Sequence, residues 1–176
     1  GNAAAANTDT IIYNIMMAFY TACSTFMGQN WGAGHKKRMM DSYLISLFYA
    51  FAVAAVLGVA FYFAGRPFLY VFTNSADVVE AGMQRMKIMC FSYAISAFMD
   101  NTIAACRGLG RTIVPTVVVI MGSCVFRVIW IFTVFRMYHT LFTLYVSYPI
   151  SWVLTVIAHM ICYLIVRRRM FPEKAA

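Results

Sequence analysis

The chain has 176 residues, of which 62% are hydrophobic and only 11% are charged. Soluble domains carry roughly 25% charged residues, so this composition excludes an ordinary water-soluble domain. The net charge of +8 does not indicate nucleic-acid binding, because the basic residues lie at the ends of apolar runs and form no basic face interleaved with aromatic residues.

Five apolar runs follow one another, and each is close to the roughly 20 residues that a helix needs to cross a bilayer. In chain order, we expect transmembrane helices at about residues 10–28, 42–65, 86–106, 112–135 and 141–166. Strands are not expected, because the period-two alternation of a barrel strand is absent. The predicted fold class is all-α: a polytopic membrane bundle of five transmembrane helices.

Glycine and proline mark the expected breaks between these helices. The stretch from Gly65 to Gly82 is predicted to form a loop between the second and third helices. Pro115 lies in the expected first turn of the fourth helix, where a missing N–H does little harm. Pro149 lies inside the fifth run, where we expect a kink.

The lysines and arginines are sorted between alternate connectors. Nine lie on one side of the predicted bundle, namely Lys36, Lys37, Arg38, Arg107, Arg111, Arg167, Arg168, Arg169 and Lys174. Four lie on the other side, namely Arg66, Arg85, Lys87 and Arg136. Cations accumulate in cytoplasmic segments, so the side with nine is predicted to be cytoplasmic, with the C-terminus. We therefore expect a multi-pass protein of the plasma membrane.

This orientation places the N-terminus outside the cell. The chain opens at Gly1 with no methionine, no basic segment and no signal sequence that could carry it across. We therefore expect this chain to be the C-terminal piece of a longer protein.

Four short motifs occur in order along the chain. They are Gly28-Gln29-Asn30-Trp31-Gly32-Ala33-Gly34, Arg107-Gly108-Leu109-Gly110-Arg111-Thr112 with Pro115, Phe126-Arg127-Val128-Ile129-Trp130, and Ser147-Tyr148-Pro149-Ile150-Ser151-Trp152. In these motifs the chain resembles the MATE (multidrug and toxic compound extrusion) transporters. The opening residues 1–7 resemble the loop between helices seven and eight of that family.

The resemblance implies that the five spans correspond to helices eight to twelve of a two-lobe, twelve-helix fold. It also implies structural roles for the motif residues Gly28, Gln29, Asn30, Gly32, Gly34, Arg107, Gly108, Gly110, Pro115, Arg127, Tyr148, Pro149 and Trp152.

The function that the resemblance implies is a cation-coupled antiporter that exports drugs and organic cations, driven by sodium or protons. The implied partners are the lipid bilayer, small amphipathic or cationic drug-like substrates, and the N-terminal lobe that this piece lacks. No nucleic acid, metal site or cofactor is expected beyond the coupling ion. The acid of helix ten in this family falls one turn from Asp100, at Ser96, so the choice between sodium and protons stays open.

Asp100 is the one acidic residue within the expected spans. Intramembrane acids are costly and usually face a wet cavity or a partner, so Asp100, Ser96 and Asn101 are candidates for ion coupling. The alternative is a structural role, in which Asp100 caps a helix or pairs with an arginine. His159 lies at a similar expected depth, about 12 Å from the basic end against about 10 Å for Asp100. An Asp–His pair would bind a proton, and a packed histidine is the alternative.

The first helix carries a mixed aromatic and polar stripe. Aromatic walls with few polar groups suit a drug-like cation, and an ordinary helix interface is the alternative. The substrate-cavity candidates are Tyr13, Met17, Tyr20, Thr21, Ser24 and, on the third helix, Tyr93.

Three further expectations concern packing. Ala50, Ala54 and Gly58 recur every fourth residue and predict a close helix contact. The side chains of Gln29 and Asn30 are expected to satisfy carbonyls freed at the helix end. Arg127 is expected to bond helix carbonyls or a group on a neighbouring helix.

Two other functions have different sequence signatures. A membrane-embedded enzyme is not predicted, because no HExxH or GxSxG motif is present. A non-transporting membrane module, acting as a partner subunit or scaffold, remains the alternative.

Overall fold

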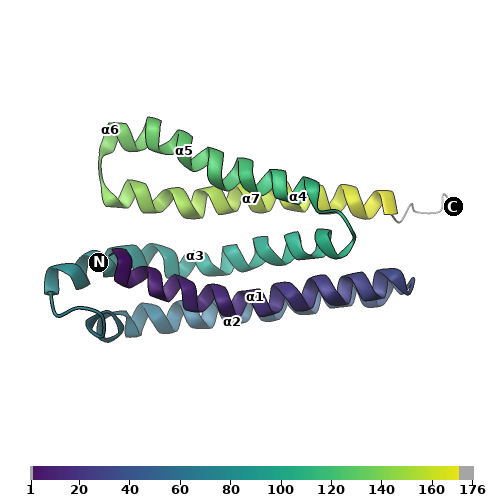
Figure 1. Cartoon of the computed structure of the whole chain (residues 1–176), viewed down its shortest axis with the longest axis horizontal. Helices are drawn as coiled ribbons and strands as arrows, with labels where there is room; N and C mark the ends of the chain where they lie inside the picture. Colours follow the sequence, from purple (N-terminus) through teal and green to yellow (C-terminus); the bar gives the residue numbers. More distant parts are fainter. Residues whose placement is uncertain (1, 171–176) are drawn as a thin grey trace.

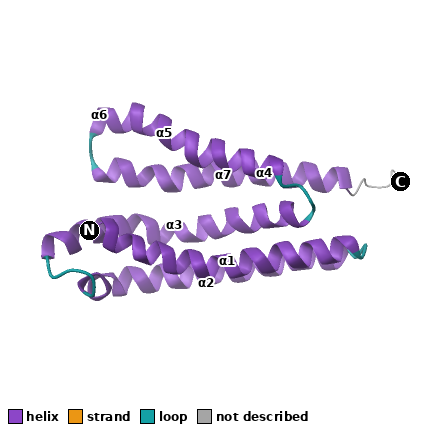
Figure 2. Cartoon of the chain, in the orientation of Figure 1, coloured by secondary structure: helices purple, strands orange, loops and turns teal. Residues whose placement is uncertain are grey.

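The computed structural model describes residues 2–170, and nearly all of them are helical. The long helices α1 (Asn2–Gly32), α2 (Lys36–Tyr70) and α3 (Ala76–Gly108) run side by side (Figure 1). A fourth helical stretch covers residues 113–138, and α7 (Leu141–Met170) returns along it. No strand occurs among the described residues (Figure 2). Within residues 2–170, five helices are long and apolar enough to cross a membrane, which confirms the predicted fold class.

The fourth helix alternates between α-helical and π-helical segments. It passes through α4 (Ile113–Val119), the π-helical η1 (Ile120–Val125), α5 (Phe126–Trp130), the π-helical η2 (Ile131–Phe135) and α6 (Arg136–Tyr138). Pro115 lies in its first turn, as predicted, and Pro149 lies within α7. His139, with φ 45°, ends the stretch in the left-handed conformation.

The helix α3 lies at the centre of the arrangement, because it packs against α1, α2 and α7. On α2, Ala50 and Ala54 are fully buried. A Cβ atom added to Gly58 would lie 2.2 Å from the carbonyl oxygen of Cys90 on α3. The predicted small-residue contact is therefore confirmed.

Several helices are longer than predicted. The first begins at Asn2 instead of residue 10, so residues 2–7, which resemble a loop, are helical; Gly1 lies outside the described residues. The predicted loop from Gly65 to Gly82 is wrong, because only residues 71–75 separate α2 from α3. Pro67 is tolerated near the end of α2, where it removes a single backbone hydrogen bond. A salt bridge of 2.7 Å between Arg66 and Glu80 joins the two helices across the connector.

The basic connectors meet at one end of the molecule. The α1–α2 connector, the α3–α4 connector and the C-terminal end of α7 all lie there (Figure 1). We call this the basic end; among the described residues it carries Lys36, Lys37, Arg38, Arg107, Arg111, Arg167, Arg168 and Arg169. Lys174 lies outside the described residues. The opposite end carries Arg66 and Arg136, whereas Arg85 and Lys87, which the sequence assigned to the same side, lie within α3.

The outer surface is strongly apolar. Side chains such as Phe63, Phe132 and Ile113 are more than two-thirds exposed. Exposing so many large apolar groups to water is unfavourable, whereas contact with lipid chains is not. The protein is a membrane protein.

Candidate functional site

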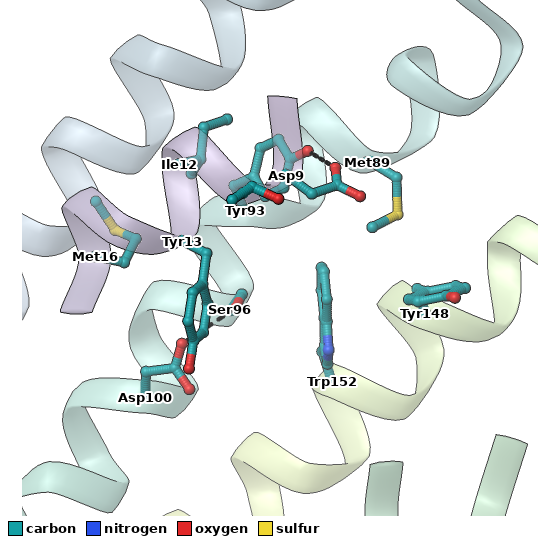
Figure 3. A pocket seen from close by; sticks show the side chains of 11 residues that line it. Asp9, Ile12, Tyr13, Met16, Met89, Tyr93, Ser96, Asp100, Tyr148 and Trp152 are labelled. Atoms are coloured by element: carbon teal, nitrogen blue, oxygen red, sulfur yellow. Dashed lines mark hydrogen bonds between the residues drawn. The ribbon is translucent and has the colours of Figure 1, made fainter. Parts of the chain in front are cut away.

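A cavity of about 300 Å³ lies between α1, α3 and α7. We call it the main cavity. It is lined by Asp9, Thr10, Ile12, Tyr13, Met16, Met89, Tyr93, Ser96, Asp100, Tyr148 and Trp152. Figure 3 shows Tyr13 extending from α1 toward Asp100, with Trp152 and Tyr148 across the cavity on α7. Four aromatic rings and two carboxyl groups therefore share one space.

Asp100 is the carboxyl group of this cavity that has few partners. Its Oδ2 atom accepts a hydrogen bond of 3.4 Å from the Ser96 hydroxyl. Within residues 2–170 it forms no salt bridge. Asp100 also lines a second cavity of about 270 Å³, between α1, α3 and the fourth helix. The side chain therefore lies in the wall between two cavities.

Arg107, the nearest arginine along α3, lines the second cavity together with Asp100 but bonds to other residues. Its guanidinium donates a hydrogen bond of 3.2 Å to the Thr116 hydroxyl on α4. It also lies 5.9 Å from the centre of the Tyr20 ring on α1. The alternative in which Asp100 pairs with an arginine is therefore not what the described residues show.

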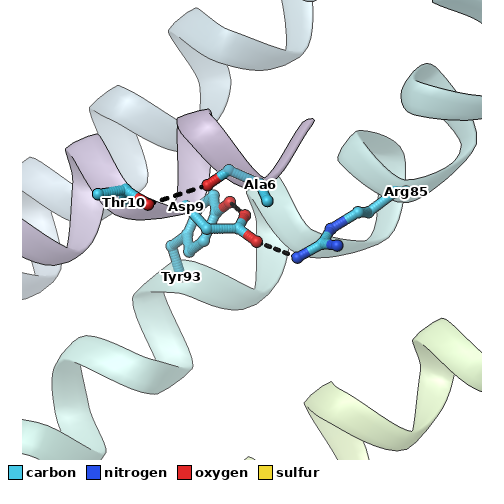
Figure 4. A network of polar contacts seen from close by, with 5 residues as sticks. All are labelled: Ala6, Asp9, Thr10, Arg85 and Tyr93. Atoms are coloured by element: carbon cyan, nitrogen blue, oxygen red, sulfur yellow. Dashed lines mark hydrogen bonds and ion pairs between the residues drawn. The ribbon is translucent and has the colours of Figure 1, made fainter. Parts of the chain in front are cut away.

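The other carboxyl group, Asp9, is fully engaged. One oxygen accepts from the guanidinium of Arg85 and the other accepts from the hydroxyl of Tyr93 (Figure 4). The Arg85 side chain is 11% exposed and the Asp9 side chain 26% exposed, so the ion pair is largely shielded.

The sequence did not predict this ion pair, because the first span was expected to begin at Thr10 and the third at residue 86, which left both Asp9 and Arg85 outside the spans. One signal was available, since Asp9 precedes Tyr13 by four residues and shares its helical face.

The predicted site residues divide into three groups. Tyr13, Tyr93, Ser96 and Asp100 line the main cavity, and Tyr13, Met17, Tyr20 and Asp100 line the second cavity. Thr21 and Ser24 line neither: the Thr21 hydroxyl donates to the Met17 carbonyl, and Ser24 packs its backbone against Gly108. Asn101 is buried on another face of α3, where its amide donates to the Ala97 carbonyl.

His159 is not brought to Asp100. The ring is fully buried, with Nδ1 2.8 Å from the Thr155 carbonyl oxygen and Nε2 3.2 Å from the Pro115 carbonyl oxygen. A carbonyl oxygen only accepts, so a neutral ring with a single N–H satisfies one of the two contacts. The hypothesised Asp100–His159 pair is therefore not formed, and His159 instead links α7 to α4.

Comparison with known proteins decides the family. The MatE family model matches residues 1–133, about three-quarters of the chain. The chain belongs to the MatE family. It is also similar to the protein DETOXIFICATION 8 of Arabidopsis thaliana, with 26% identity over 98 residues. That match covers 56% of this chain and 20% of the plant protein, so the chain spans about a fifth of this relative. The resemblance stated from the motifs is confirmed.

Two motifs of this MatE chain meet where α1 crosses α3. A Cβ atom added to Gly108 would lie 2.5 Å from the carbonyl oxygen of Ser24, and one added to Gly28 would lie 3.2 Å from the carbonyl oxygen of Gly108. These glycines therefore permit a backbone contact. Gly34 and Gly110 have φ values of 73° and 75° and form the turns at the basic end.

The amide side chains of the first motif do not cap the helix end as expected. The carbonyls of Gln29 and Asn30 accept instead from the backbone N–H groups of Ala33 and His35. The Asn30 side chain donates to the Phe26 carbonyl and to the Ser42 hydroxyl, so it joins α1 to α2.

The third and fourth motifs meet across the outer helix pair. Arg127 donates a hydrogen bond of 3.0 Å to the Ser151 hydroxyl, which confirms the expected bond to a neighbouring helix. Its guanidinium lies 4.1 Å from the centre of the Tyr148 ring and 5.8 Å from that of Trp152. Both rings line the main cavity, whereas Arg127 does not. Arg127 therefore supports the α7 side of the main cavity through its contacts with these two rings. The fourth motif lies beyond the residues matched by the MatE family model.

Proposed function

We propose that this chain is the C-terminal lobe of a cation-coupled antiporter that exports drugs and other organic cations. Membership of the MatE family supports a transporter of this kind. The observation that carries the proposal is the contrast within the main cavity: Asp9 is neutralised by Arg85, whereas Asp100 has a single hydroxyl partner among the described residues. The cavity therefore offers one carboxylate to an incoming cation.

The walls of the main cavity suit such a cation. Tyr13, Tyr148 and Trp152 surround the approach to Asp100, and aromatic faces attract desolvated organic cations. An apolar lining with few polar groups is the usual composition of a small-molecule site. Substrate binding would combine ring contacts with one charge contact.

Exchange follows from competition for Asp100. A carboxylate in a low-dielectric environment attracts one cation strongly. A second cation is attracted much less, because the first has already neutralised the negative charge. A proton, or a sodium ion also held by the Ser96 hydroxyl oxygen, would release an organic cation, and the reverse would reload the site. In this scheme the basic end faces the cytoplasm of a plasma-membrane protein, and an N-terminal lobe completes the transport path.

The test uses the full-length protein in cells that lack their own exporters and in proteoliposomes. Asp100→Asn is expected to lower gradient-driven efflux of a fluorescent organic cation by about 10- to 100-fold, the equivalent of one charge-assisted hydrogen bond. Asp77→Asn makes the same change at an exposed position in the first turn of α3 and should leave efflux unchanged.

Unchanged efflux in Asp100→Asn, at normal abundance in the membrane, would disprove the assignment. A full-length protein without efflux under any gradient would favour the non-transporting module instead.

A further inference from the structure

A third cavity, which Asp100 does not line, lies at the basic end between α4 and α7. Its volume is about 270 Å³. Val114 on α4 and Ile161 and Ile165 on α7 form an apolar wall, and each is about half exposed. Arg111, in the α3–α4 connector, and Arg169, in the last turn of α7, also line the cavity. We call this cavity the basic groove.

The charge of the basic groove is uncompensated within residues 2–170. The salt bridges among these residues join other side chains, and neither Arg111 nor Arg169 takes part in one. Arg167 and Arg168 add positive charge in the last turn of α7. The one acidic residue described at this end is Asp41, on α2, which does not line the groove and forms no salt bridge with either arginine. The groove therefore presents two arginines that have no acidic partner among the described residues.

An amphiphilic ligand fits both halves of this groove. The planar guanidinium fork matches the oxygens of a phosphate group. Apolar side chains directly beside the two arginines offer contact to a hydrocarbon chain but nothing to a water-soluble anion. Basic pockets between transmembrane helices are known to recognise anionic lipid head groups. We propose that the basic groove binds an anionic phospholipid, with its phosphate between Arg111 and Arg169 and its acyl chain along Ile161 and Ile165.

The opposite end provides a natural control. A cavity of about 360 Å³ there is lined by Gln84, Lys87, Ile88, Phe142 and Tyr145. It combines apolar walls with a single cation and lacks an arginine pair. A lipid bound only by apolar contact should occupy both cavities alike, whereas the proposed anionic lipid should distinguish them.

The experiment measures retained lipid on the full-length protein, purified from mixed phosphatidylglycerol and phosphatidylcholine nanodiscs, by native mass spectrometry. We expect the wild type to retain phosphatidylglycerol and to unfold at a higher temperature in its presence than in phosphatidylcholine alone. The double variant Arg111→Gln/Arg169→Gln should lose retention by about tenfold or more, since each basic residue near an anionic surface contributes several-fold. Lys87→Gln should retain as much as the wild type.

Three results would overturn the proposal. One is equal retention of phosphatidylglycerol by the folded double variant and the wild type. A second is equal thermal stabilisation of the wild type by phosphatidylcholine. The third is full displacement of phosphatidylglycerol by soluble glycerol phosphate, which would make the arginines a free-phosphate site.

If the glutamine variant fails to fold, the double variant Arg111→Lys/Arg169→Lys can replace it in the test. Lysine keeps the positive charge but lacks the planar guanidinium group that binds two phosphate oxygens at once. It should retain less phosphatidylglycerol than the wild type but still more of it than phosphatidylcholine. Equal retention of the two lipids by the lysine variant would also contradict the proposal.

Discussion

At the scale of single residues, two aspartates in one cavity differ through their partners. Asp9 receives donors on both oxygens, from Arg85 and Tyr93, and so contributes to holding α1 against α3. Asp100 receives one long hydrogen bond from Ser96, in its own helix. A shielded, satisfied ion pair has a structural role, whereas a carboxylate with spare acceptor capacity is available for a ligand.

This division predicts a specific stability pattern. Asp9→Asn removes the charge that balances a largely buried guanidinium, so it should lower the free energy of unfolding by about 2–4 kcal/mol. Arg85→Gln should cost a similar amount, but Asp9→Asn/Arg85→Gln should cost clearly less than the sum, because neither charge is then left alone. Thermal unfolding in detergent measures the loss of stability of each of the three variants relative to the wild type. Additive losses would show that the two side chains are not coupled.

At the scale of helices, close backbone contacts at glycine organise the packing. Gly58 on α2 lies against the Cys90 carbonyl and Gly108 on α3 lies against Ser24, so α3 is approached closely from two sides. Without a strong hydrophobic drive between helices in lipid, such contacts give much of the association energy through van der Waals packing.

Gly58→Ala should therefore destabilise the protein strongly. The new methyl group would lie 2.2 Å from a backbone oxygen, which cannot swing away as a flexible side chain can. We expect a loss of about 1–3 kcal/mol or more in the free energy of unfolding, as for an overpacked core. Gly32→Ala is the matched control, because nothing outside the adjacent backbone of its own helix lies within 4 Å of its added Cβ. A thermal shift experiment that finds equal stability for both variants would refute this account of the α2–α3 contact.

At the scale of the whole molecule, the sequence predicted what depends on length and composition. Apolar runs of bilayer thickness predicted five spans, and alternate basic connectors predicted which helix ends lie together. Local sequence signals were wrong where tertiary packing outweighed them. Gly65 and Pro67 predict a helix break, yet α2 continues through both residues. The helix continues because Gly65 packs against Met83 and Met86 of α3. Sequence depth alone also suggested that His159 faces Asp100, whereas helix rotation, which no local pattern specifies, turns its ring to Pro115.

The charges predict the direction in which the bundle crosses the membrane, and this orientation is the last prediction. Lys and Arg are retained on the cytoplasmic side, so the basic end should face the cytoplasm and the 71–75 connector the exterior. Cys124 is the exposed native thiol among the described cysteines, so Cys124→Ser gives a suitable background. In intact cells, a membrane-impermeant maleimide should label Asn74→Cys in that connector but reach Lys37→Cys, in the first turn of α2, only after permeabilisation. The reverse pattern would place the basic end outside, and the cytoplasmic orientation in the proposed transport scheme would then be wrong.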